Sequence, residues 1–99
     1  MKKFLFISYG FEVPDPAMIS EWAEWFSLIE KRIVEHGRLG DGQCFRKGSR
    51  EPIHFSDKGG TGFMIFEAES IEEAEDLASR CPVIGHNMLQ EIIPADVEC

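Results

Sequence analysis

The fold is decided by residues 62–82, GFMIFEAESIEEAEDLASRCP, which join a strand to a helix. The opening residues, Gly62–Ala68, are apolar on both faces and predict a β-strand. Ser70-Ile71-Glu72-Glu73 follows as a capping box, in which the serine oxygen and the glutamate carboxylate accept from backbone N–H groups at a helix start. The helix is expected to end near Pro82 and to lie on a sheet through a narrow apolar stripe, Ile71, Ala74, Leu77, Ala78 and Cys81.

Upstream of this segment, the sequence predicts another strand and a longer helix. Lys3–Tyr9 is dense in aliphatic and aromatic residues and is the expected first strand. Asp15-Pro16 predicts a helix start, because the carboxylate accepts from free N–H groups and proline has none to leave unpaired. The helix is expected to run from Pro16 to His36, with Gly37 as the residue that ends it. Its stripe is Met18, Trp22, Trp25, Phe26, Ile29 and Ile33, interpreted as core, with the wall of an apolar pocket as the alternative for the tryptophans.

The remaining strands are less clearly marked. Either Cys44-Phe45 or Ile53–Phe55, or both, is expected to form the second strand, and Met88–Pro94 the last. The order of elements is then β-α-β-β-α-β. This order predicts one α+β domain over residues 1–99, with a ferredoxin-like antiparallel sheet that carries both helices on one face.

The apolar strands also predict a partner for the second face of the sheet. Phe4-Leu5-Phe6-Ile7 and Phe63-Met64-Ile65-Phe66 offer apolar side chains to both faces, whereas helices are expected to cover only one. An uncovered apolar face favours aggregation. We therefore expect a second copy of the chain to cover it, as a homodimer through the open sheet face.

Composition and charge exclude several classes of partner. The chain has 10 Lys and Arg against 18 Asp and Glu, for a net charge of −8, so neither nucleic acid nor an anionic membrane is an expected partner. The three cysteines lack zinc or redox spacing and are expected to be free thiols in a reducing compartment. The apolar run after Met1-Lys2-Lys3 is too short for a signal peptide. These features together predict a cytoplasmic protein.

Three segments carry a resemblance to a known family. They are the opening strand Lys3–Tyr9, Gly37-Arg38-Leu39, and residues 62–82. On these residues the chain resembles the YCII-related proteins, small dimeric α+β-barrel proteins whose relatives include a group named for an Asp-Gly-Pro-Phe motif. The matching residues specify strand, cap and helix end, so the resemblance implies the fold and a homodimer with sheets face to face more than it implies an activity.

The resemblance also implies a chemistry that this chain matches only in part. In some members a histidine early in the first helix, with a nearby aspartate, is associated with a lyase or dehydrochlorinase-type role. Here Glu21, Trp22 and Glu24 stand where that histidine would lie. Ser56-Asp57-Lys58-Gly59 stands in place of the Asp-Gly-Pro-Phe tetrapeptide, so Asp57 alone is carried over as a catalytic candidate.

The residues themselves suggest a site between the sheet and the helices. His54 and Asp57 are close enough in sequence for a carboxylate to orient an imidazole in acid–base work, although such a spacing also arises by chance in a polar loop. His86 is expected to meet Tyr9 and Ser8 at a pocket, with a plain surface turn as the alternative. Trp22 is a further ligand-binding candidate. No metal or cofactor is expected, because the histidines lack metal spacing and no cofactor motif is present.

Two function hypotheses follow from these residues. The first is a cofactor-free small-molecule enzyme of lyase or proton-transfer type, with a cleft bordered by Tyr9, His54, Asp57 and His86. The alternative is a non-catalytic ligand-binding or interaction domain that acts as a homodimer.

Overall fold

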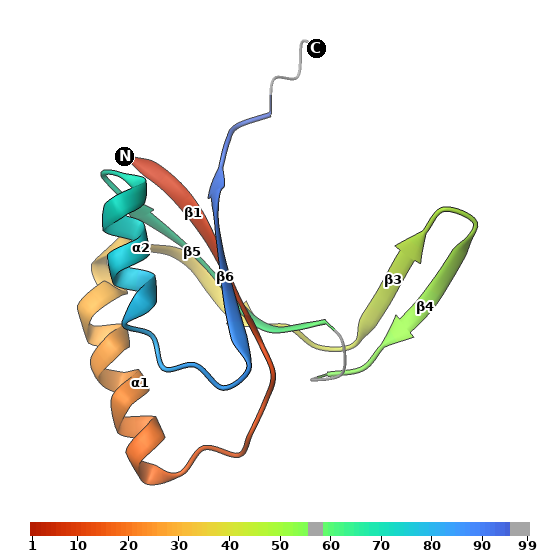
Figure 1. Ribbon diagram of the computed structural model, residues 1–99, viewed down its shortest axis with the longest axis horizontal. Helices are drawn as coiled ribbons and strands as arrows, with labels where there is room; N and C mark the ends of the chain where they lie inside the picture. The colour runs from red at the N-terminus through yellow and green to blue at the C-terminus, as the bar shows by residue number, and fades with distance from the viewer. Residues whose placement is uncertain (56–58, 96–99) are drawn as a thin grey trace.

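The computed structural model describes residues 1–55 and 59–95 as an α+β protein (Figure 1). A four-stranded antiparallel sheet has the order β2-β5-β1-β6, with bounds Ile33–Arg38, Gly60–Ala68, Lys2–Tyr9 and His86–Ile92. The helices are α1 (Pro16–Ile29) and α2 (Ile71–Ser79), and a short 3-10 helix, η1 (Glu30–Arg32), follows α1. Strands β3 (Gly42–Arg46) and β4 (Ser49–Ile53) form a separate hairpin.

Both predicted helix starts are confirmed. Asp15 Oδ1 accepts from the Met18 N–H group at 2.8 Å, and Pro16 occupies the first turn of α1. Ser70 Oγ accepts from the Glu73 N–H group at 3.2 Å, and the Glu73 carboxylate accepts from the Glu69 N–H group at 3.0 Å. The capping box therefore satisfies donors on both sides of the first residue of α2.

The predicted end of the first helix is wrong. Helix α1 ends at Ile29 instead of His36, and Ile33–Arg38 forms β2, which pairs with β5. The β-branched pair Ile33-Val34 favours an extended backbone at this point. Gly37 is a strand residue and does not end a helix. A Cβ there would lie 3.1 Å from the Phe63 ring on the facing strand, so glycine makes room for that ring.

The second and last strands also differ from the prediction. Cys44-Phe45 lies in β3, and Ile53 is the last residue of β4, so both patches belong to the hairpin and neither forms the second strand of the main sheet. The last strand begins at His86, because close contact with β1 extends it toward the N-terminal side. Two glycines allow this approach: a Cβ on Gly85 would lie 2.5 Å from the Tyr9 carbonyl oxygen, and Gly10 has a φ of +90°.

The core lies between the helices and one face of the sheet. Phe4, Phe66 and Ile29 are fully buried there, and the stacked rings of Phe4 and Phe66 lie 5.9 Å apart. Trp25 is also buried, and its Nε1–H donates to the Leu77 carbonyl oxygen at 2.8 Å, which ties α1 to α2. Each fully buried large side chain contributes roughly 1.5–3 kcal/mol.

The other face of the sheet carries no helix in the described part of the chain. Its central side chains are half-buried apolar residues from β1 and β5, namely Leu5, Ile7, Phe63 and Ile65. In Figure 1 both helices lie on the left of the sheet, and the β3–β4 hairpin extends to the right, away from them. The hairpin gives a Cα radius of gyration of 15.2 Å, larger than the ~13 Å of a compact chain of this length.

Among the described residues, no helix has both the length and the apolar character needed to cross a membrane.

Candidate functional site

A cleft lies between α1 and the helix-covered face of the sheet. It consists of two neighbouring cavities of about 340 and 290 Å³. Both cavities are lined by the same group of residues from α1, β1, β2 and β5: Ser8, Trp22, Phe26, Arg38 and Gly62. We call the two cavities together the aromatic cleft.

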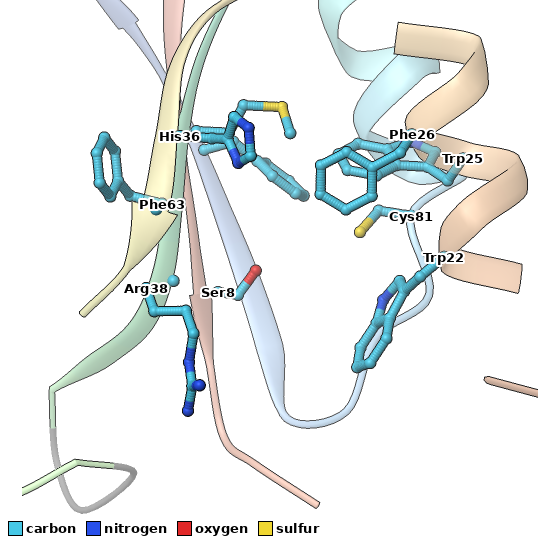
Figure 2. Close-up of a pocket in the computed structure, with 12 residues that line it drawn as sticks. Ser8, Trp22, Trp25, Phe26, His36, Arg38, Phe63 and Cys81 are labelled. Atoms are coloured by element: carbon cyan, nitrogen blue, oxygen red, sulfur yellow. The ribbon is translucent and has the colours of Figure 1, made fainter. Parts of the chain in front are cut away.

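The helix side of the aromatic cleft is made of aromatic rings whose polar groups are already paired. Trp22 donates from Nε1 to the Pro82 carbonyl oxygen at 3.4 Å. Phe26 meets the Trp25 ring edge to face, with centroids 5.4 Å apart. Figure 2 shows Trp22 and Phe26 turned toward the sheet. Because the hydrogen bond of Trp22 is used within the protein, its ring is left to form an apolar wall.

The sheet side of the aromatic cleft contributes polar side chains among its apolar ones. His36 and Arg38 are two residues apart on β2 and therefore point to the same face. Figure 2 shows His36, Arg38 and Ser8 on the sheet side of the cavity, across from the helix. Gly62 lies between Arg38 and Ser8 in the register of the sheet. A Cβ on Gly62 would meet only the Gly37 carbonyl oxygen, at 3.5 Å, so its missing side chain leaves the floor of the cleft open.

The charge of the aromatic cleft is opposite to that of the protein. No Asp or Glu lines either cavity among the described residues, although the chain carries a net charge of −8. Arg38 has no carboxylate within ion-pair distance in the described part of the chain. Its guanidinium carbon instead lies 5.1 Å from the centroid of the Phe55 ring, as a cation–π contact. The cleft therefore combines aromatic walls with a cation that no described carboxylate pairs with.

The base of the hairpin holds Phe55 beside Arg38. Asp41 Oδ1 accepts from the Phe55 N–H group at 2.9 Å, which joins the segment before β3 to the segment after β4. The Phe55 ring also meets Phe11 edge to face at 5.1 Å. Both rings line the second cavity, so the hairpin base closes one side of the aromatic cleft.

A cysteine in the wall of the cleft is chemically inert. Cys81 lines the first cavity, and burial raises the pKa of its thiol to about 11. Its Sγ–H donates to the Pro82 carbonyl oxygen at 3.5 Å. The thiol is therefore protonated at neutral pH and is not a nucleophile.

The structure brings some of the predicted site residues together. Tyr9 lines the second cavity, and Trp22 lines both. The rings of His86 and Tyr9 stack, with centroids 4.5 Å apart and an interplanar angle of 8°, but His86 lines neither cavity of the aromatic cleft among the described residues. His86 belongs to β6 and not to a surface turn, and its imidazole is exposed. The functional roles of all three residues stay predictions.

One of the two catalytic residues predicted from the sequence, His54, lies outside the aromatic cleft. His54 follows β4, is exposed, and lines neither cavity of the aromatic cleft in the described part of the chain. Asp57 lies outside the described residues. A role for His54 and Asp57 in catalysis stays a prediction.

Sequence reasoning missed the two residues of β2, His36 and Arg38, whose polar side chains line the cleft. The expected helix over Pro16–His36 extended the helical period past Ile29 and so hid the strand that carries them. The signal that could have found them is local: Ile33-Val34 marks a strand, and a strand places residues 36 and 38 on one face.

Comparison with known proteins gives no family for this chain. No model of a protein family matches the sequence, and no curated protein matches it.

Proposed function

We propose that the protein binds a small molecule with an apolar, aromatic body in the aromatic cleft. The observation that carries this proposal is the cleft itself, with tryptophan and phenylalanine walls, an open floor at Gly62 and a cavity of about 340 Å³. Ligand sites in proteins are typically apolar clefts of ~300–1,000 Å³ with few polar groups. The proposal keeps the fold and family expected above: a ferredoxin-like, YCII-related protein located in the cytoplasm.

The chemistry that we propose for the cleft is cofactor-free proton transfer, of lyase type. His36 supports it, because its ring lines the cavity 5.8 Å from the Phe26 ring and imidazole is a common general acid or base. Arg38 on the same face would stabilise negative charge that develops on the substrate. His36 thus takes the acid–base role in this proposal, and His54→Ala is the variant that tests the role of the exposed histidine.

The binding proposal is tested by filling the cleft. Gly62→Val places a β-branched side chain on the cleft floor at a strand position that accepts it. We expect 2-naphthamide or 2-naphthoate to bind the natural protein, as measured by isothermal titration calorimetry, and binding to be lost in Gly62→Val. Far-UV circular dichroism of the variant checks that the fold is kept.

A matched substitution on the separate β3–β4 hairpin controls for added side-chain volume away from the cleft. A Cβ on Gly42, in β3 of the hairpin, meets nothing within 4 Å, so Gly42→Val should leave binding unchanged. The proposal is overturned if neither compound binds the natural protein, or if Gly62→Val binds them as tightly as the natural protein does.

We also propose that the chain forms a homodimer through the open sheet face. Its support is the row of half-buried apolar side chains with no helix over them in the described part of the chain: Leu5, Ile7, Phe63 and Ile65. Single domains seldom leave such a face to water. This interaction surface is the feature that favours the alternative, a non-catalytic domain, and it is compatible with a binding cleft on the other face.

The dimer is tested by its mass. Sedimentation velocity of the natural protein at micromolar concentration should give a species of twice the 11.3 kDa chain mass. Ile65→Glu places a charge at the centre of the open face and should give the monomer, whereas Leu28→Glu, on the exposed side of α1, should not. A monomeric natural protein would contradict the proposal.

A further inference from the structure

A row of residues crosses the helix-covered face of the sheet at the aromatic cleft. In the register of the strands, Arg38 of β2 pairs with Gly62 of β5, Gly62 pairs with Ser8 of β1, and Ser8 pairs with Asn87 of β6. All four residues line the cleft. Neighbouring strands are about 4.8 Å apart, so the row spans about 14 Å from Arg38 to Asn87. We call it the cleft row.

The two ends of the cleft row differ in chemistry. At one end the Arg38 guanidinium has no carboxylate partner in the described part of the chain. Gly62 then leaves open space. At the other end stand the Ser8 hydroxyl and the Asn87 side-chain amide.

Asn87 is the unusual member of the cleft row. Its Nδ2 atom is buried and makes no hydrogen bond to the described residues. An unpaired buried donor is costly, and folded proteins seldom keep one without a use. Asn87 lines the second cavity, so a hydrogen-bond acceptor on a bound molecule could supply the partner that this donor lacks.

We infer that the natural ligand of the aromatic cleft is an aromatic carboxylate that also carries a hydrogen-bond acceptor at its far end. The carboxylate pairs with Arg38, the ring lies over Gly62 against Trp22, and the acceptor faces Ser8 and Asn87. This inference rests on the proposed binding function and specifies its ligand. Charge complementarity supports it, because the lining of the cleft includes a cation and no acid among the described residues, in a protein of net charge −8.

The carboxylate end of the inferred ligand is tested with two probes of similar shape, one an anion and the other neutral. 2-Naphthoate and 2-naphthamide share the same ring system, and only the first is an anion at neutral pH. We expect calorimetry to show that the acid binds about tenfold to a hundredfold more tightly than the amide, the range of a charge-assisted hydrogen bond. Arg38→Gln should remove this preference.

A charge-matched variant serves as the control. Arg50 is exposed on β4 and lines neither cavity, and Arg50→Gln changes the net charge of the chain by the same amount as Arg38→Gln. Arg50→Gln should keep the preference for the acid. Arg38→Gln and Arg50→Gln should bind 2-naphthamide with equal affinity. This result would show that Arg38→Gln has not collapsed the cleft.

The acceptor end is tested with 6-acetyl-2-naphthoate and 6-ethyl-2-naphthoate, which differ in a carbonyl oxygen. The acetyl compound should bind about three- to tenfold more tightly, and Asn87→Val should cancel that difference while keeping the preference for acid over amide.

The outcomes separate this inference from the proposed function. Equal binding of acid and amide to the natural protein, or an acid preference that survives Arg38→Gln, overturns the inference and leaves the binding cleft standing. Failure of the acetyl group to strengthen binding overturns the acceptor half of the inference. Failure of every probe to bind overturns the proposed function as well.

Discussion

The two ends of the central strands β1 and β5 carry side chains of different size on the face that the helices cover. At one end, Phe4 and Phe66 face each other across β1 and β5, fully buried, and fill the space between the layers. At the other end, the corresponding pair is Ser8 and Gly62, and the space becomes the aromatic cleft. The large side chains at the closed end keep the helices apart from the sheet. The small residues at the open end do not fill the space that this separation leaves. The aromatic cleft thus arises from a change of residue size along two strands.

Side-chain ties within the helix layer follow the same division. At the closed end, Arg32 of η1 donates to the Glu73 carboxylate at 2.6 Å, and this links the end of α1 to the first turn of α2. At the open end, the hydrogen bond from Trp22 to the Pro82 carbonyl oxygen is longer, at 3.4 Å.

The largest change in stability is expected from a substitution at the closed end. Phe66→Ala removes a fully buried ring and should lower the free energy of unfolding by about 3–5 kcal/mol, as measured by urea denaturation. Phe45→Ala is the control, because the Phe45 side chain is 72% exposed, and it should change stability by less than about 0.5 kcal/mol. Similar losses in the two variants would contradict the assignment of the core to the closed end.

A smaller effect of opposite sign is expected at the open end. Asn87→Val removes a buried donor that has no partner in the described part of the chain, and it adds a residue that favours strands. The free energy of unfolding should rise by about 1 kcal/mol, measured by the same denaturation experiment. A loss of stability would show that Asn87 has a structural partner, and the donor would then not be reserved for a ligand.

The smallest change in stability is expected at the ion pair between Arg32 and Glu73, and it depends on pH. The pKa of Glu73 lies below its ordinary value, because the carboxylate accepts from the Glu69 N–H group and from Arg32. A lowered pKa in the folded state stabilises the protein above the ordinary glutamate pKa of about 4.3, and this contribution is lost as the pH falls through the folded value. Glu73→Gln should therefore be slightly less stable than the natural protein at pH 7, and the difference in stability should be smaller at pH 3.

Thermal unfolding at the two pH values measures this difference. The effect is small because the ion pair is partly exposed to solvent, with side-chain exposures of 33% and 34%. A difference that persists unchanged at pH 3 would assign the effect of the substitution to the lost shape of the side chain and not to its charge.

Much of the fold could be predicted because local chemistry specifies it. Ser70 and Asp15 mark helix starts through their own hydrogen bonds, and the apolar runs of β1 and β5 mark buried strands. The boundary between α1 and β2 could not be read from periodicity, because Ile33 continues the helical spacing of Ile29. What converts residues 33–38 into a strand is pairing with β5, a contact distant in sequence.

The candidate site was predictable only in part for the same reason. Tyr9 lies on a strand that was predicted correctly, Trp22 lies on the correctly predicted first part of a helix, and both line the cleft. His36 and Arg38 lie on the strand that was mistaken for a helix end, so their common orientation was hidden. Asn87 was not a candidate, although in β6 it completes a row across the sheet. Local sequence can mark a strand, but only the register shows which residues meet across strands.

The projecting β3–β4 hairpin is a suitable place to insert a peptide from another protein. Its turn at Lys47-Gly48 is exposed, and Gly48 has a φ of +82° with nothing within 4 Å of a Cβ. An epitope or a binding peptide grafted in place of this turn would be displayed away from the helices. The hydrogen bond from the Phe55 N–H group to Asp41 would still hold the base of the hairpin.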